Sequence, residues 1–370
     1  MKKHAVFFLI VGLLLFFAGL LMIFDTTAAE VIDRSLDQGT HYALVKQFFY
    51  GAIGAIVSYG IWTIGYQRLL AHARLLFFFF TLLLVLVFIP PVGQQINGAH
   101  RWLNVFGFSF QPSELMKIVI PLFYIKEVAW RAKTLSFSQF LKKLIWIAIP
   151  LLLILIEPDN GSVAIILATL AILFVLTEVR WTFWALPLAI FLVAGGVVAA
   201  QMPHVSDRLR IYLDPELDLK GKGHQPYQAK IAAGSGKLLG RGVGESLQKL
   251  DYLPEARSDY IAAIFAEEFG FLGVLGLIFL YLTFGYLGFY LSAQTLDREG
   301  FYLVAIFTFL ICFQAFLNLG IVSGLLPSKG TNLPFFSQGG SSLISNCIIM
   351  ALILNVSHAV RKEKYCKNLI

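Results

Sequence analysis

The chain has 370 residues, of which 58% are hydrophobic and only 14% are charged, and its formal net charge is +7. A soluble globular protein is about 45–50% apolar and about 25% charged, so this composition excludes a soluble enzyme as well as a disordered chain. It favours a polytopic membrane protein built as a single membrane domain over residues 1–370.

Apolar segments long enough to cross a membrane recur along the chain. The first, Ala5–Phe24, has no charged residue and follows Lys2 and Lys3. It is longer than the roughly 7–15 apolar residues of a signal peptide, which favours an uncleaved first span. With nine later segments it predicts an all-α protein of ten transmembrane helices, the others being 46–65, 74–91, 112–128, 143–157, 161–178, 181–202, 259–288, 300–325 and 341–359.

The distribution of Lys and Arg predicts the orientation of these spans. If both termini are cytoplasmic, fifteen of the 29 Lys and Arg lie inside, five lie in short outer segments, and nine lie in the long segment 203–258. This agrees with the positive-inside rule and gives no indication of a nucleic-acid partner. The topology makes 203–258 a large extracytoplasmic loop between the seventh and eighth spans.

The first polar cluster surrounds the start of the fourth span. Arg101 precedes it, and Pro112 suits the first turn of a helix. Glu114 and Lys117 are three residues apart and share one helix face, so they are expected to pair. The pair is either a local ion pair at a helix start or part of a charged site at the outer membrane edge, because ionisable groups inside a span usually face a cavity.

Two further features divide the middle of the chain. The turn around Asp159, from Glu157 to Gly161, separates the fifth and sixth spans. The loop 203–258 is glycine-rich and charged, and loops of that length are often functional.

The eighth span begins with an acidic residue above a face of small residues. Asp259 is predicted just inside this helix, and the small face behind it is formed by Ala263, Ala266, Gly270 and Gly273. Such a face favours close helix packing. Asp259 is then either a helix N-cap or a general base at the mouth of a crevice. Glu267 and Glu268, two turns deeper, are buried carboxylates for which the sequence identifies no partner.

The last polar cluster precedes the tenth span. Residues 324–342 form an irregular outer turn that contains Lys329 and ends at Gly339, Gly340 and Ser341. Free N–H groups at a helix start, with hydroxyls and a lysine nearby, suit a phosphate group. An ordinary serine N-cap after a glycine turn is the alternative.

These motifs together resemble the SEDS family of bacterial shape, elongation, division and sporulation proteins, over nearly the whole chain. The resemblance rests on motifs that occur in the family's order: Arg101-Trp102, Gln111-Pro112-Ser113-Glu114 with Lys117, Pro158-Asp159-x-Gly161, Leu253-Pro254-Glu255-x-x-Ser258-Asp259-Tyr260, Glu267-Glu268, and 326–342. Residues 248–254 and 326–330 resemble the division branch more than the elongation branch. The chain departs from the family at Arg257, Gln338, Glu157 and Asn160, where His, Tyr, Gln and Leu are usual.

The resemblance implies a peptidoglycan glycosyltransferase that polymerises lipid II on the outer face of the bacterial cytoplasmic (inner) membrane, at the division site. Asp259 is then the catalytic base, and the residues expected to bind substrate or shape the site are Arg101, Glu114, Lys117, Asp159, Lys329, Gly339, Gly340 and Ser341.

The implied partners are lipid II, the growing glycan strand, membrane lipids, a class B penicillin-binding transpeptidase and other divisome membrane proteins, with no nucleic acid. A divalent cation (Mg²⁺ or Mn²⁺) could assist at the pyrophosphate, but the sequence contains no ligand cluster for a metal. The alternatives are a lipid II flippase, an elongation-type polymerase and a divisome scaffold without catalytic activity.

Overall fold

The computed structural model describes residues 2–33, 39–90, 92–96, 99–105, 108–201, 212, 221, 223–250, 253, 255–328 and 330–367. Each predicted span falls on a helix: α1 (Lys2–Asp33), α2 (Tyr42–Ile64), α4 (Ala73–Leu86), α5 (Pro112–Glu127), α6 (Phe137–Ile156), α7 (Asn160–Leu176), α8 (Trp181–Gln201), α11 (Ile261–Ala293), α12 (Arg298–Val322) and α13 (Gly340–Lys367). Among the described residues, six helices are long and apolar enough to cross a membrane. The helical, polytopic class is therefore confirmed, and the count of ten spans stays a prediction.

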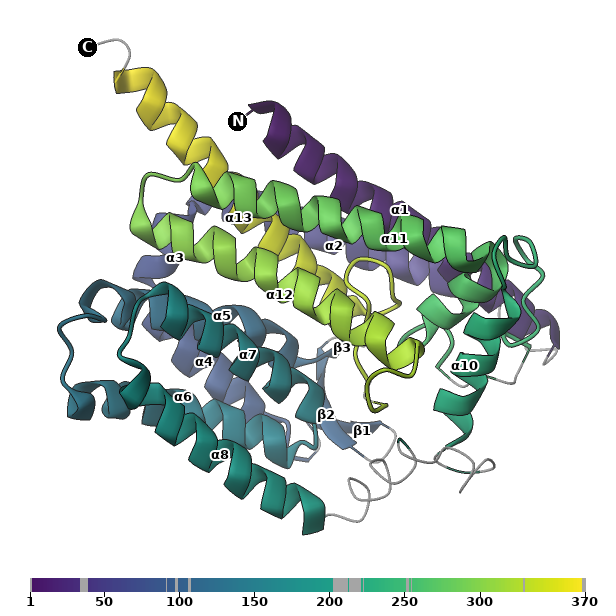
Figure 1. Ribbon diagram of the computed structural model, residues 1–370, viewed down its shortest axis with the longest axis horizontal. Coiled ribbons are helices and arrows are strands. Elements are labelled where there is room, and N and C mark those ends of the chain that lie inside the picture. The colour runs from purple at the N-terminus through teal and green to yellow at the C-terminus, as the bar shows by residue number, and fades with distance from the viewer. Residues whose placement is uncertain are drawn as a thin grey trace.

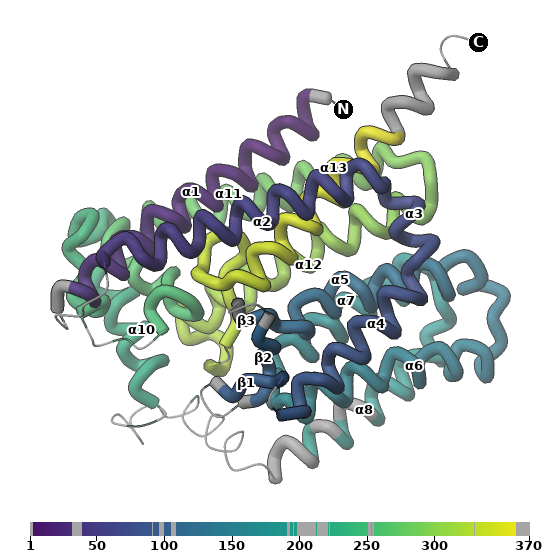
Figure 2. Tube along the Cα trace, turned by 180° about the vertical axis from the view of Figure 1, so that it is seen from behind, coloured from purple at the N-terminus to yellow at the C-terminus, as the bar shows by residue number. Residues whose placement is uncertain are grey.

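The helices form two groups, which Figures 1 and 2 show from opposite sides. One group contains α1, α2, α11, α12 and α13, in which α13 packs on α2 and α11 packs on both α1 and α12. The other contains α4 to α8. The short helix α3 (Tyr66–Ala71) connects the groups, and a 3₁₀ turn, η1 (Ala129–Arg131), follows α5.

Helix α5 lies on the side of the second group that meets the first, and it contacts α4 and α7 of its own group and α12 and α13 of the other. Most of its residues from Pro112 to Ile125 are buried. Because protein rather than lipid surrounds this helix, it can carry Glu114 and Lys117 within a membrane domain. The outer surfaces of other helices are apolar instead; Ile56 on α2 and Leu82 on α4 are 72% and 55% exposed.

Two regions differ from the prediction: one forms a small sheet in an otherwise helical chain, and the other forms a helix within the predicted loop. The strands β1 (Gly93–Ile96), β2 (Ala99–Val105) and β3 (Phe108–Phe110) form an antiparallel sheet in the order β1-β2-β3. Within the predicted loop 203–258, residues His224–Ser235 form helix α10, which packs on α11. Most of residues 202–222 lie outside the described part of the chain.

Helix α11 is interrupted at Gly270, which has φ 66° and ψ −166°, a conformation that glycine adopts without steric cost. The segment 237–242 supplies hydrogen bonds on both sides of the break. Arg241 N donates to Glu267 O at 3.0 Å, and Phe271 N donates to Lys237 O at 2.9 Å. The small-residue face therefore does pack closely, but at Ala266 and Gly270 its partner is the backbone of residues 236–240 rather than another helix.

Candidate active site

A cavity of about 780 Å³ lies between the two helix groups, beside strand β2. Eight of the nine residues singled out by the sequence line it: Arg101, Glu114, Lys117, Asp159, Asp259, Gly339, Gly340 and Ser341. The ninth, Lys329, lies outside the described residues. The structure therefore brings residues from five separate segments of the sequence to one site.

Glu114 and Lys117 form the predicted ion pair in the wall of this cavity. Lys117 Nζ lies 2.9 Å from Glu114 Oε1 and 2.8 Å from Glu114 Oε2, and it also donates to Gln314 Oε1 of α12 at 3.1 Å. Lys117 is only 2% exposed. An ammonium buried to this degree needs a paired carboxylate, so Glu114 is required to hold Lys117 in the wall.

Asp159 and Arg101 fix the turn between α6 and α7. The Asp159 carboxylate caps α7 by accepting from Ser162 N at 3.2 Å, and it also accepts from Ser113 Oγ at 3.0 Å. Arg101 donates to the backbone carbonyls of Glu157 at 2.8 Å and Pro158 at 2.7 Å. Both side chains therefore connect elements around the cavity.

The predicted span 143–157 ends one residue too late, because α6 ends at Ile156 and leaves the carboxyl group of Glu157 in this turn, outside the spanning helix. Glu157 is fully buried, and neither carboxyl oxygen has a hydrogen-bond partner among the described residues. Burial and the neighbouring Asp159 raise the pKa of Glu157 to about 9, although Arg101 opposes the shift. The side chain is therefore protonated at neutral pH, and its neutral form is similar to the Gln that the family usually has there.

Asp259 lies at the cavity wall but is not an N-cap. Helix α11 begins at Ile261, and the cap position is Tyr260, whose side chain makes no capping bond. Asp259 is half-buried and precedes the helix instead of lying just inside it. The peptide is held by Asn318 Nδ2, which donates to the carbonyl of Asp259 at 2.8 Å. A Cβ added to Gly330 would lie 2.8 Å from Asp259 Oδ2, so the carboxylate lies against the backbone of that loop.

Arg257, which stands where the family usually has His, has an anionic neighbour on α1. Its guanidinium lies 3.2 Å from the Glu30 carboxylate of α1. The Arg257 carbonyl also accepts from Gln338 N at 2.9 Å. Arg257 thus connects the segment before α11 to α1 and to the segment before α13.

Polar groups at the start of α13, where the sequence suggested a phosphate site, are bonded to other parts of the protein. Gly339 N donates to Gln47 Oε1 at 3.2 Å, and Ser341 Oγ accepts from Gln111 N at 2.9 Å. A Cβ on Gly340 would lie about 2.5 Å from the Tyr50 ring. Glycine is therefore needed at position 340 for packing against Tyr50, whether or not a phosphate binds nearby.

Several cavity residues were missed by sequence reasoning. Gln47 on α2 and Gln314 and Asn318 on α12 are buried polar residues that lie at or next to the cavity. The available signal was an amide inside an apolar span, because such groups usually face the interior of a helix bundle. Tyr50 gave no such signal, because aromatic residues are common in every span.

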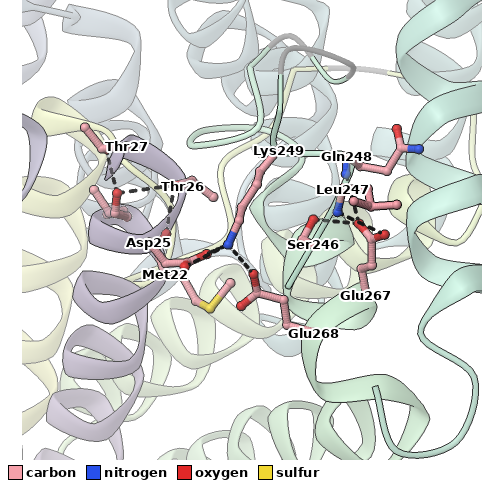
Figure 3. Close-up of polar contacts among 11 residues, drawn as sticks. Met22, Asp25, Thr26, Thr27, Ser246, Leu247, Gln248, Lys249, Glu267 and Glu268 are labelled. Atoms are coloured by element: carbon pink, nitrogen blue, oxygen red, sulfur yellow. Dashed lines mark hydrogen bonds and ion pairs between the residues drawn. The ribbon is translucent and has the colours of Figure 1, made fainter. Parts of the chain in front are cut away.

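Glu267 and Glu268 do have partners, and Figure 3 shows Ser246, Leu247, Gln248 and Lys249 among them. Glu267 accepts from Ser235 Oγ at 3.0 Å, from Ser246 Oγ at 2.6 Å and from the backbone N–H groups of Leu247 and Gln248. These contacts hold α10 and the loop that follows it on α11.

The Lys249 ammonium connects that loop to two helices. Its Nζ lies 2.7 Å from Glu268 Oε1 on α11 and 2.7 Å from Asp25 Oδ2 on α1 (Figure 3). The Lys249 side chain is 4% exposed. We call Asp25, Lys249 and Glu268 the lysine clasp. It fastens the loop that leads directly to Asp259.

Among the described residues, no group of three or more His, Cys, Asp and Glu is placed to hold a metal ion. The cavity therefore shows no ready-made site for a divalent cation within the described part of the chain.

Comparison with known sequences places the chain in a protein family. The family described as "Cell cycle protein", which comprises FtsW, RodA and SpoVE, matches residues 5–362. A probable peptidoglycan glycosyltransferase FtsW from Saccharophagus degradans is 36% identical over 351 residues, covering 93% of this chain and 90% of the relative. The probable FtsW of Alcanivorax borkumensis is also 36% identical, over 350 residues.

Solved structures have the same fold. A chain from a study of polymerisation and crosslinking by a peptidoglycan synthase complex aligns with a TM-score of 0.71 and 25% identity, covering 91% of this chain and 96% of that chain. The rod shape determining protein RodA of Thermus thermophilus aligns with a TM-score of 0.66 and 22% identity, covering 95% of each chain. From these matches and the shared motifs, the chain belongs to the FtsW/RodA/SpoVE (SEDS) family of cell cycle proteins.

Proposed function

We propose that this protein is a peptidoglycan glycosyltransferase that polymerises lipid II into glycan strands for septal wall synthesis. The observation that carries the proposal is the convergence of eight separately identified residues on one cavity, with Asp259 in its wall. The names of the FtsW relatives, at 36% identity over most of the chain, support the same activity.

In the proposed reaction, the Asp259 carboxylate removes the proton from the 4-hydroxyl of the acceptor sugar. The hydroxyl oxygen then attacks the anomeric carbon of the donor, the bond from that carbon to the pyrophosphate oxygen breaks, and undecaprenyl pyrophosphate leaves. A general base must lie within hydrogen-bond reach of the proton it removes. The half-buried position of Asp259 at the cavity wall allows that approach.

The other site residues have positioning roles in this proposal. Glu114 and Lys117 shape the wall where α5 meets α12, and Asp159 and Arg101 fix the α6–α7 turn. The Ser341 hydroxyl can still donate its proton to a pyrophosphate oxygen, because the bond from Gln111 uses it only as an acceptor. Backbone N–H groups in the first turn of a helix have no partner within that helix and can bind phosphate.

The proposed topology places both termini in the cytoplasm and residues 203–258 outside, in the inner membrane at the division site. A class B penicillin-binding transpeptidase is the proposed partner, and other divisome membrane proteins are expected nearby. The relation to a chain from a polymerising and crosslinking complex supports this partnership.

The proposal is tested by incubating the purified chain with lipid II, with and without its transpeptidase partner, and separating the products by length. Glycan strands made by the wild-type protein and lost in Asp259→Asn support it. Lipid II translocation across vesicles without polymerisation would favour the flippase instead. In that case the charged groups should lie along a path through the membrane, whereas the eight site residues here line a single cavity.

A further inference from the structure

A second cavity, of about 600 Å³, lies far from the site just described. It is bounded by the start of α4, the end of α5, η1 and the start of α6. Figures 1 and 2 show the α5–α6 connection at the end of the molecule that faces away from β1, β2 and β3. In the proposed topology this end is cytoplasmic.

The lining of this cavity is strongly basic. It contains four cations, Arg74, Lys126, Arg131 and Lys143, and one carboxylate, Glu127. Glu127 already accepts from Arg74 Nη2 at 2.9 Å and from Lys143 Nζ at 2.6 Å. With its single anion fully engaged, the lining keeps a net positive charge.

Two of the cations are available to a ligand. Lys126 is 40% exposed, and its Nζ is 3.8 Å from Glu299, a distance at which the ion pair is loose. Arg131 is exposed and forms no ion pair with a carboxylate in the described part of the chain. Between them Trp130 is 64% exposed, and its indole N–H donates to Glu299 Oε1 at 2.6 Å. Tryptophan is enriched at the level of lipid headgroups.

The surface directly beyond the cavity is apolar. Phe78 lies one helical turn after Arg74 on α4, and Trp146 lies three residues after Lys143 on α6, so each shares a face with a lining cation. The two rings meet edge to face, with centroids 5.5 Å apart, and are 49% and 47% exposed. A basic recess at the end of an exposed aromatic face matches a molecule that has an anionic head and hydrocarbon chains.

We propose that this cavity binds the phosphate of an anionic phospholipid, such as cardiolipin or phosphatidylglycerol, while its acyl chains cover Phe78 and Trp146. A free phosphate shares the headgroup chemistry, but it would leave the aromatic face uncovered. Basic pockets between helices on the cytoplasmic side are known sites for anionic headgroups. Simple positive-inside bias does not account for a cavity that continues into an apolar face.

The test measures lipid binding to the purified full-length chain by native mass spectrometry, titrating cardiolipin, phosphatidylglycerol or neutral phosphatidylcholine. The variant Lys126→Ala/Arg131→Ala removes two lining cations that have few contacts within the protein. The matched control Lys133→Ala/Lys142→Ala removes the same charge from exposed residues that do not line the cavity.

At about 1 kcal/mol for each basic residue near an anionic headgroup, the lining variant should bind cardiolipin roughly 30-fold more weakly. The control should bind like the wild type, and inorganic phosphate should not displace the lipid. Trp146→Ala should weaken cardiolipin binding without affecting folding. Equal binding of phosphatidylcholine, equal loss in the control, or displacement by inorganic phosphate would each overturn the proposal. None of these results depends on polymerase activity.

Discussion

Removing Lys249 from the lysine clasp should release the loop that follows α10 from helices α1 and α11. The Lys249 ammonium lies within 2.8 Å of carboxylate oxygens of Asp25 and Glu268, and the Glu268 side chain has no exposed surface. In Lys249→Met the apolar stem remains, but two carboxylates lose their cation. Removing one partner of a buried ion pair lowers stability by about 3–5 kcal/mol, because the remaining charge stays buried without a partner.

That cost should appear as local opening of the loop. Because 1.36 kcal/mol corresponds to a factor of ten, the opening equilibrium should rise by about two to more than three orders of magnitude. The amide hydrogens of Leu247 and Gln248, which donate to Glu267, report this opening directly. Hydrogen–deuterium exchange of the purified protein in detergent measures it, and those amides should lose protection while the amides of α12 keep theirs.

A neutral replacement of the whole clasp separates charge from shape. In Asp25→Asn/Lys249→Met/Glu268→Gln no buried charge is left unpaired, so loop protection should return close to that of the wild type. Protection within threefold of wild type in Lys249→Met would refute the argument. So would a triple variant as unprotected as the single one.

Three further predictions concern other parts of the molecule. Because the folded-state pKa of Glu157 is about 9 and its ordinary value is 4.5, the folded protein binds more protons than the unfolded chain between these values, and stability falls as pH rises through that window. Glu157→Gln should therefore be more stable than the wild type by about 3 kcal/mol at pH 7 and unfold at a higher temperature. The difference in stability should vanish near pH 4.5, and a difference that does not change with pH would contradict this prediction. Glu114→Ala should strongly reduce lipid II polymerisation at normal protein level, because it leaves the Lys117 ammonium buried without its carboxylate, and full activity would reduce the pair to a helix-start contact. Gly223→Cys should react with a membrane-impermeant thiol reagent in intact cells, and labelling only after the membrane is breached would reverse the proposed topology.

The helices and the site residues were predictable from sequence for different reasons. Long apolar runs identify the helices, because a helix that crosses the hydrocarbon core of a membrane needs about 20 predominantly apolar residues. Polar residues at the ends of those runs identify the cavity residues, because a charge there needs a partner or a solvated space. Asp159 illustrates the limit, since the sequence marks it but does not show that it caps α7 and accepts from Ser113.

The features that were missed depend on contacts between distant segments. Helix α10 has no apolar stripe with helical spacing, so its sequence gives no amphipathic pattern. The Lys249 pairing joins residues 224 positions apart, which one sequence cannot reveal. The break in α11 at Gly270 is stable only because the segment 237–242 supplies backbone partners. The glycine alone was equally consistent with ordinary helix packing.

The central claim is that Asp259 is the general base of a glycan polymerase. The most direct measurement is the initial rate of lipid II polymerisation by purified Asp259→Asn protein, with lipid II binding and thermal unfolding measured on the same sample. Asn keeps the size of Asp but cannot accept the proton, so the rate should fall about 10²–10⁴-fold while binding and unfolding stay as in the wild type. Polymerisation by Asp259→Asn at the wild-type rate would contradict the account.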